Sequence, residues 1–212
     1  MNSMGAGLQS AHQQELTHEL LLRETNHRCG NDLQLVVSLL ALQGRRAANA
    51  EVRQALSDAA ERVTILARAR AAMQRERAPS LETALRQVCE ALHAQAEPRS
   101  IVISLKAFQE VDGLHASQIT ALALVVNELA TNAIKHAFED GVTGHVHVSV
   151  NRHGSRDITI TVDDDGLPFP DAEGNGLGID LVKRLMASIG GLFIPPPAGT
   201  KLFELRVPLA SN

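Results

Sequence analysis

The chain has 212 residues and a formal net charge of −4, with 44% apolar and 21% charged residues, which is typical of a soluble globular protein with one large or two small domains. The negative charge gives no reason to expect a nucleic-acid partner, and a chain with no tryptophan, no tyrosine and five phenylalanines has an aliphatic core and few side chains for stacking on bases. No apolar run approaches the length of about 18 residues that a membrane span needs, and the N-terminus lacks the pattern of a signal peptide, so we expect a cytoplasmic protein without membrane contact.

The cysteines and histidines show no metal-binding pattern. Cys29 and Cys89 are the only cysteines and lie in unrelated segments, so we interpret them as two reduced thiols. The nine histidines are scattered, and "HVH" at 145–147 is typical of the outward side of a strand.

Residues 12–77 have the pattern of a helical hairpin, preceded by a short or disordered extension at 1–11. Apolar residues recur at alternating intervals of four and three on both sides of "GRRAAN" at 44–49, which predicts two antiparallel helices with heptad repeats. A lone hairpin buries too little surface to be stable, so we expect two chains to form a four-helix bundle and therefore a homodimer. The alternative is a helical pair that packs on the rest of the same chain.

The first predicted helix contains the unusual stretch "HRCGN" at 27–31. Gly30 costs about 1 kcal/mol relative to alanine inside a helix, so a sequence selected only for folding would avoid it. Glu24 precedes His27 by three residues and Asn31 follows it by four, and both spacings place the side chains on the same surface as the imidazole. The stretch therefore predicts either a helix break or a polar patch that performs chemistry around His27.

The segment "RAPS" at 77–80 predicts a domain boundary, because Pro79 disfavours helix at Ala78 and Ser80 is a good N-cap. We therefore separate the hairpin of 12–77 from a second domain, 80–212. Helical and strand periodicities alternate in this domain, and helices segregated from an antiparallel sheet form an α+β sandwich. We predict helices over 81–94, 117–138 and 176–191, strands over 100–107 and 200–209, and a β-hairpin over 144–164.

The segment "NELATNAIKH" places polar residues on one side of an apolar helix. Glu128, Asn132 and Lys135 recur at intervals of four and three, and Asn127 lies next to them, so the residues share a helix face. Carboxylate and amide oxygens suit Mg²⁺, and a lysine can bind phosphate. The alternative is a solvated helix face.

Two glycine-containing stretches add to this pattern. "DDDG" at 163–166 follows a strand, and its carboxylates could accept a hydrogen bond from an amino group such as that of adenine, although an acidic turn has the same sequence. "GNGLG" at 174–178 precedes a helix, where free N–H groups bind anions. It lacks the lysine of a P-loop and does not follow a strand of a βαβ unit, which argues against dinucleotide binding. "GT" at 199–200 indicates little alone.

In this order, "NELATNAIKHAF", "DDDG", "GNGLG" and "GT" resemble the N, G1, G2 and G3 boxes of the GHKL-type (Bergerat) ATP-binding fold of histidine kinases, DNA gyrase and mismatch-repair ATPases. "ETNHRCGNDLQLVVSLLALQ" resembles the phosphoacceptor helix of the histidine kinase subfamily with an HRxxN motif, which is HWE-like. The resemblance covers nearly all of residues 20–209. It implies an ATP-binding α/β sandwich that follows a dimeric phosphotransfer bundle.

The resemblance also implies the substrates, partners and site residues. ATP and Mg²⁺ are expected ligands, and the expected partner is the receiver domain of a response regulator, whose aspartate accepts the phosphoryl group. The implied roles at the acceptor are His27 as nucleophile, Arg28 and Asn31 as contacts of the phosphoryl oxygens, and Glu24 as the one nearby source of carboxylate assistance, if any is used. At the phosphates, the implied roles are Asn132 as Mg²⁺ ligand, Glu128 at the water shell of the ion with Asn127 nearby, and Lys135 and His136 as phosphate contacts. At the adenine, Asp164 binds the amino group and Gly166 completes its motif. Gly176 and Gly178 belong to the lid, and Thr200 lies at the base of the pocket.

The sequence departs from the family pattern at two places. Pro168 stands where the second glycine of Asp-x-Gly-x-Gly is usual, and the lid between Pro170 and Gly174 is short, so nucleotide binding could be weakened. The absence of tryptophan excludes the branch with a tryptophan box. With 26 residues before His27, we expect either a fragment or a sensor-less kinase that receives its signal from a separate sensor protein.

Three functions are therefore compatible with the sequence. The first is an ATP-dependent histidine kinase. The second is a response-regulator phosphatase or a histidine phosphotransferase that hardly uses ATP, in which Asn31 could orient a water. The third is a non-catalytic dimeric adaptor, against which the retained Asn132, Asp164 and glycines argue.

Overall fold

The computed structural model describes residues 32–75, 80–107, 111–154, 156–168, 177–197 and 199–209. The chain divides into two compact units between Ala67 and Arg68, and each unit is considered separately below. The predicted extension at 1–11, the beginning of the first predicted helix and most of the predicted boundary at 77–80 lie outside the described residues.

The first unit contains a helical hairpin. Residues 32–46 are helical, and α2 spans Ala50–Arg75, so that its last turns belong to the second unit. The turn is stabilised by Arg53, whose guanidinium donates to the carbonyls of Ala47 and Ala48 at 2.8 and 3.0 Å. Gly44 brings the two helices close together, because a Cβ at this position would lie 3.7 Å from Leu56 Cβ. The predicted break at 44–49 is confirmed, although the helix continues to residue 46.

The second unit is built on a five-stranded sheet among the residues that the structure describes, with the order β1-β2-β3-β5-β4. The predicted antiparallel sheet is wrong at one edge, since β1 runs parallel to β2 while the other neighbours are antiparallel. The chain returns from β1 to β2 through α4, and such a crossover joins parallel strands. The strands are β1 (Ile101–Ala107), β2 (Gly144–His153), β3 (Asp157–Asp164), β4 (Leu192–Ile194) and β5 (Phe203–Pro208).

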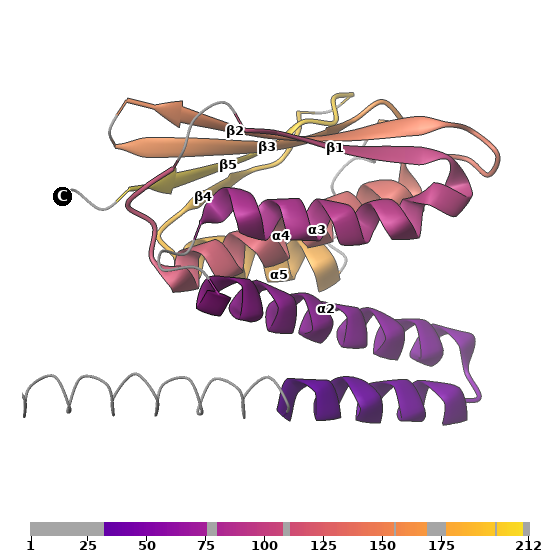
Figure 1. Cartoon of the computed structure of the whole chain (residues 1–212). Helices are drawn as coiled ribbons and strands as arrows, with labels where there is room; N and C mark the ends of the chain where they lie inside the picture. The colour runs from indigo at the N-terminus through magenta and orange to yellow at the C-terminus, as the bar shows by residue number, and fades with distance from the viewer. Residues whose placement is uncertain are drawn as a thin grey trace, which may run out of the picture. The chain divides into compact units, whose positions relative to one another are not determined.

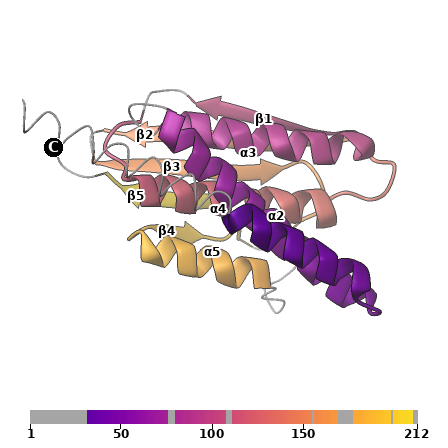
Figure 2. The ribbon, with the colours of Figure 1, turned by 60° about the horizontal axis from the view of Figure 1, so that its bottom comes forward.

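Three helices cover one face of this sheet, as Figures 1 and 2 show. They are α3 (Leu81–Ala96), which the short 3-10 helix η1 (Glu97–Arg99) follows, α4 (Ala116–His136) and α5 (Leu177–Ser188). Ser80 caps α3 as predicted, since its hydroxyl accepts a hydrogen bond from the Thr83 N–H. The unit is therefore the predicted α+β sandwich, with α4 between α3 and α5.

Strand alternation separates a buried face of the sheet from a polar one. The face toward the helices carries aliphatic side chains that are at most 3% exposed: Val146, Val148, Val150, Ile158, Ile160 and Val162. The opposite face carries polar residues such as His145, His147 and Thr161. Among the described helices, none has both the length and the hydropathy that crossing a membrane requires.

Candidate nucleotide-binding site

The predicted polar residues of α4 differ in how deeply they are buried. Asn127 and Glu128 are only 2% and 5% exposed, so the alternative of a solvated helix face is wrong for these two residues. Asn132 and Lys135 are half-buried and lie on the same side of the helix as Glu128. His136 is exposed at the last residue of α4. Buried polar side chains therefore line the side of α4 on which Asn132 and Lys135 remain partly accessible.

The beginning of α5 lies against this polar side of α4. A Cβ placed on Gly178 would lie 3.2 Å from Glu128 Oε2 and 3.4 Å from Asn132 Nδ2. The structure thus brings together residues of the predicted N and G2 boxes that are some fifty positions apart in sequence. Because the first N–H groups of a helix have no partner within it and carry partial positive charge, an anion beside Glu128 and Asn132 would meet hydrogen-bond donors from α5.

Asp164 ends β3 on the face of the sheet that the helices cover. It pairs with Val146, which is fully buried, and paired residues of neighbouring strands point to the same side. Its Oδ1 accepts a hydrogen bond from the Gly166 N–H at 3.0 Å. Burial raises the pKa of Asp164, and the negative Asp163 and Asp165 raise it further, whereas the Gly166 hydrogen bond and the positive Lys201 lower it.

Gly166 holds the loop after β3 against the C-terminal end of α4. A Cβ at Gly166 would overlap the carbonyl oxygen of Ala137 and lie 2.9 Å from the Ala137 Cβ. The next residue, Leu167, donates its N–H to the same Ala137 carbonyl at 2.7 Å. The absence of a side chain at Gly166 therefore allows the loop that carries Asp164 to dock directly onto the helix that carries Asn132.

Thr200 lies near this region without a described contact to the other predicted site residues. Its N–H and its hydroxyl both donate to the Pro197 carbonyl, at 2.9 and 2.8 Å. The positive charge of the neighbouring Lys201 lowers the pKa of Asp164. The sequence offered no signal for Lys201 beyond its position next to "GT".

The remaining predicted residues are not placed. Glu24, His27, Arg28, Asn31 and Gly176 lie outside the described residues, as do Pro170 and Gly174 at the ends of the predicted lid. Pro168 is described and exposed, directly after the loop that docks on α4.

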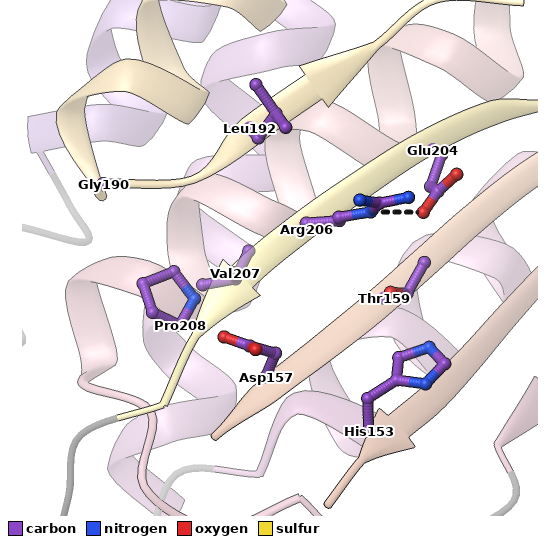
Figure 3. Close-up of a pocket in the computed structure, with 9 residues that line it drawn as sticks. All are labelled: His153, Asp157, Thr159, Gly190, Leu192, Glu204, Arg206, Val207 and Pro208. Atoms are coloured by element: carbon purple, nitrogen blue, oxygen red, sulfur yellow. Dashed lines mark hydrogen bonds and ion pairs between the residues drawn. The ribbon is translucent and has the colours of Figure 1, made fainter.

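A separate depression of about 500 Å³ contains none of the predicted site residues. Figure 3 shows it over β3, β4 and β5, where Thr159, Leu192 and Arg206 lie side by side on the polar face of the sheet. Arg206 Nε donates to Glu204 Oε1 at 2.6 Å at its rim. The depression is therefore on the opposite side of the sheet from Asp164 and α4.

Comparisons with known proteins identify the family to which the chain belongs. Residues 79–192 match a family model described as histidine kinase-like ATPase domain, and residues 24–97 match one described as histidine kinase. The sensor histidine kinase PdtaS of Mycobacterium tuberculosis is 31% identical over 180 residues, which are 82% of this chain and 36% of that protein. The blue-light-activated histidine kinase 2 of Erythrobacter litoralis is 27% identical over 204 residues, with 90% and 58% covered.

The fold is also found in solved structures. The EL346 blue-light activated histidine kinase of Erythrobacter litoralis superposes with a TM-score of 0.63 at 23% identity, over 86% of this chain and 59% of that one. Its isolated histidine kinase domain gives 0.62 at 21% identity, over 83% and 96%. The chain spans about a third to three fifths of the length of the curated relatives named above. The chain belongs to the histidine kinases, in the HWE-like group, and carries a GHKL-type ATP-binding domain.

Proposed function

We propose that the chain is an ATP-dependent protein-histidine kinase that phosphorylates His27 and passes the phosphoryl group to an aspartate of a response-regulator receiver domain. The observation that carries the proposal is the close approach of Gly178 to Glu128 and Asn132, where an added Cβ would lie 3.2 and 3.4 Å from their side-chain atoms. This contact puts a helix N-terminus, a carboxylate and a carboxamide around one point, as a polyphosphate with its cation requires. This arrangement favours a kinase over a non-catalytic adaptor, because an adaptor does not need a site for a polyphosphate and its cation.

The adenine end of the nucleotide belongs at Asp164. A half-buried carboxylate on the helix-covered face can accept a hydrogen bond from the 6-amino group of adenine. Because the carboxylate is partly shielded from water, this hydrogen bond is stronger than it would be in solution. Gly166 fixes the loop that carries this carboxylate, and Thr200 forms the base of the pocket in this proposal.

The phosphate end belongs beside α4 and α5. Asn132 would offer an amide oxygen to Mg²⁺, Glu128 would hold the ion through water with Asn127 nearby, and Lys135 and His136 would bind the phosphates. The bound ion would supply neutralisation of the phosphate charge. Gly176 and Gly178 would form the side of the lid toward the phosphates, and a side chain at Gly178 would crowd Glu128 and Asn132.

The chemistry at the acceptor follows from the imidazole. A neutral His27 nitrogen attacks the γ-phosphorus, a P–N bond forms as the bond to the β–γ bridging oxygen breaks, and ADP leaves. Arg28 and Asn31 contact the transferred oxygens, and Glu24 is the carboxylate nearest in sequence. The receiver-domain aspartate then attacks the phosphorus and regenerates the neutral histidine.

The hairpin supports a homodimer in this proposal. Large apolar side chains remain exposed in the single chain on residues 32–46 and at the beginning of α2: Leu35, Val36, Leu39, Leu42 and Val52. A second hairpin would cover them in a four-helix bundle.

The kinase and the phosphatase functions are separated by Asn132→Asp. The added negative charge should weaken nucleotide binding and abolish the incorporation of γ-phosphate, while phosphatase activity on a phosphorylated receiver domain should persist. ATP binding is measured by calorimetric titration and phosphatase activity by phosphate release. A wild-type chain that is folded but binds no ATP would contradict the kinase function, and equal loss of both activities would contradict separate sites.

A further inference from the structure

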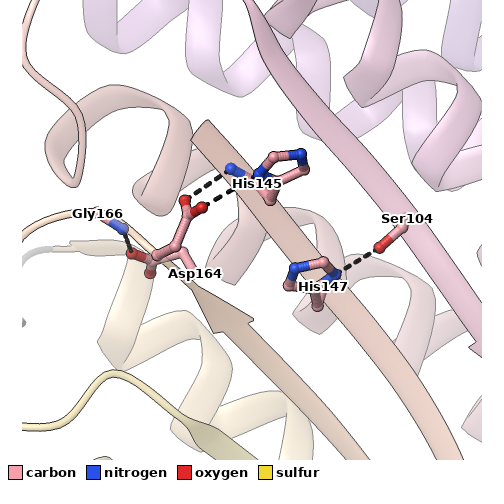
Figure 4. Close-up of polar contacts among 6 residues, drawn as sticks. Ser104, His145, His147, Asp164 and Gly166 are labelled. Atoms are coloured by element: carbon pink, nitrogen blue, oxygen red, sulfur yellow. Dashed lines mark hydrogen bonds and ion pairs between the residues drawn. The ribbon is translucent and has the colours of Figure 1, made fainter. Parts of the chain in front are cut away.

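The loop that carries Asp164 is held on its outer side by one residue of β2. Asp165, between Asp164 and Gly166, makes three contacts with His145. The His145 N–H donates to Asp165 Oδ1 at 2.7 Å, the ring Nδ1 lies 3.1 Å from Asp165 Oδ2, and the Asp165 N–H donates to the His145 carbonyl at 3.2 Å. Figure 4 marks the two contacts of His145, and the carboxylate that they reach is the unlabelled Asp165.

The loop after β3 is therefore held by hydrogen bonds on both of its sides. On the inner side, the Gly166 N–H bonds Asp164 Oδ1, and the Leu167 N–H bonds the Ala137 carbonyl. On the outer side, the bidentate Asp165 carboxylate fixes the direction of the backbone between Asp164 and Gly166. Asp164 is the last residue of β3 and Asp165 follows it directly, so a fixed Asp165 also restrains the backbone that carries the Asp164 carboxylate.

The ring of His145 is itself held in place. It stacks on the ring of His147 with centroids 5.8 Å apart and planes 4° apart. His147 Nδ1 in turn lies 2.7 Å from the Ser104 hydroxyl of β1, as Figure 4 also shows. A row of polar contacts thus connects the edge strand β1 through two stacked imidazoles to the loop.

The electrostatics agree with this arrangement. Slight desolvation raises the pKa of Asp165, but the hydrogen bonds from the His145 backbone and ring and the charge of a protonated ring outweigh it, so that the pKa is lowered overall. The ring donates to Asp165 either when protonated or as the neutral tautomer with the proton on Nδ1. Both side chains are about half exposed, so the contact positions the loop more than it stabilises the fold.

We propose that His145 is a positioning residue for adenine recognition: the contact of its ring with Asp165, added to the two backbone hydrogen bonds, aims the Asp164 carboxylate at the 6-amino group. The inference rests on the proposed role of Asp164 in ATP binding. His145 lies on the polar face of the sheet, whereas Asp164 points to the opposite face, so we expect its effect to be confined to how well the pocket distinguishes adenine from other bases.

The test compares ATP with ITP, in which a 6-oxo group replaces the 6-amino group. We expect the wild-type chain to bind ATP more tightly than ITP, because only the amino group can donate to Asp164. In His145→Ala, ATP affinity should fall about three- to tenfold while ITP affinity stays within twofold, so that the preference shrinks. His145→Gln, whose amide can donate to Asp165, should recover at least half of the preference on a logarithmic scale.

The control is His153→Ala. His153 is also an exposed histidine of β2, but it lies at the other end of the strand and pairs with Asp157, so this variant should keep the wild-type preference. Melting temperatures of the three variants exclude a general loss of folding, which would lower the affinity for both nucleotides together.

Two results would overturn the inference in distinguishable ways. A wild-type preference that persists unchanged in His145→Ala would show that His145 does not position Asp164, and would leave the ATP site intact. A wild-type chain that binds ATP and ITP equally would remove the role of Asp164 itself, and the inference with it.

Discussion

Asp163, Asp164 and Asp165 have the same side chain but different environments, because neighbouring positions at the end of β3 lie on opposite faces of the sheet. Asp164 points to the face that the helices cover and is half-buried, whereas Asp163 pairs with the exposed His147 on the polar face, and Asp165 is exposed and bound to His145. Burial raises the pKa of Asp164, whereas the contacts with His145 lower that of Asp165. One of three adjacent carboxylates is thereby prepared for a ligand.

Replacing Asp164 by asparagine should separate binding from stability. Because the pKa of Asp164 is raised in the folded chain, the ionised carboxylate disfavours folding at pH values above that pKa, and the neutral asparagine removes this cost. We expect at least a tenfold loss of ATP affinity in calorimetric titrations, with an unfolding temperature at pH 7 that is unchanged or higher. Asp163→Asn is the matched control and should leave ATP affinity unchanged. An Asp164→Asn variant that binds ATP as the wild type does would place the adenine elsewhere.

Cys89 should give the stability of the chain a distinct dependence on alkaline pH. Desolvation, followed by the charge of Glu90, raises the pKa of the Cys89 thiol from 9.0 to about 11, against a smaller opposing effect of Arg86. Above pH 9 the unfolded chain releases this proton while the folded chain keeps it, so the free energy of unfolding falls as the pH rises toward 11. Urea titrations at several pH values should show a shallower fall in Cys89→Ala. Parallel pH profiles for the two proteins would contradict the buried thiol.

Two glycines connect the elements of the nucleotide site, but their neighbours differ. A Cβ at Gly166 would meet the backbone of Ala137, whereas a Cβ at Gly178 would meet the ends of the Glu128 and Asn132 side chains. A backbone carbonyl cannot move without displacing the end of α4, while a side-chain terminus can rotate. The first glycine is therefore needed for the packing of the loop after β3 on α4, and the second keeps open the space beside Glu128 and Asn132 that the proposed function assigns to the phosphates.

Alanine at these two positions should affect different quantities. Gly166→Ala should lower the free energy of unfolding by about 1–3 kcal/mol, because overpacking against backbone forces a shift. Gly178→Ala should unfold within about 1 kcal/mol of the wild type but lose several-fold in ATP affinity. Denaturant titrations and calorimetry measure both quantities. Equal stability of Gly166→Ala and the wild type would show that the loop after β3 does not dock on α4.

The sequence predicted most elements of the fold, because their periodicities are strong. The alternation of β2 and β3, the Ser80 cap and the apolar side of α4 are local patterns that the structure retains. The parallel pairing of β1 with β2 was missed, since strand direction depends on the path of the chain through α4 and not on local pattern. The three-residue strand β4 was also missed, because three residues are too few for a periodicity.

The candidate site was predictable where its residues are close in sequence. Glu128, Asn132 and Lys135 follow from helical spacing, and Asp164 from a strand that ends in acidic residues and glycine. The charge of Lys201 near Asp164, the contact of Gly166 with Ala137 and the hold of His145 on Asp165 join segments that are distant in the chain. Such contacts exist only after the sheet has formed, so no local pattern encodes them.

At the scale of the whole molecule, each of the two units leaves large apolar side chains exposed among the described residues. Leu39 is 53% exposed on the hairpin, and Leu192 is 55% exposed on the sheet. In the proposed homodimer only the former lies in the bundle between the two chains.

Charge on the hairpin should therefore dissociate the dimer. Leu39→Glu should raise the dimer dissociation constant at least tenfold in sedimentation equilibrium, because a carboxylate in the apolar bundle is strongly disfavoured. Leu192→Glu, at a site of equal exposure, should leave the oligomeric state unchanged. A dimer of Leu39→Glu as stable as that of the wild type would place the interface elsewhere.

The most direct measurement is incubation of the purified chain with Mg²⁺ and ATP labelled in its γ-phosphate, with His27→Ala and Asp164→Asn in parallel. We predict a label that acid removes and alkali preserves, as a phosphohistidine requires, on the wild type alone. Label that persists in His27→Ala would place the acceptor elsewhere. No label on a folded, dimeric wild type would contradict the kinase function and favour a phosphatase or phosphotransfer protein.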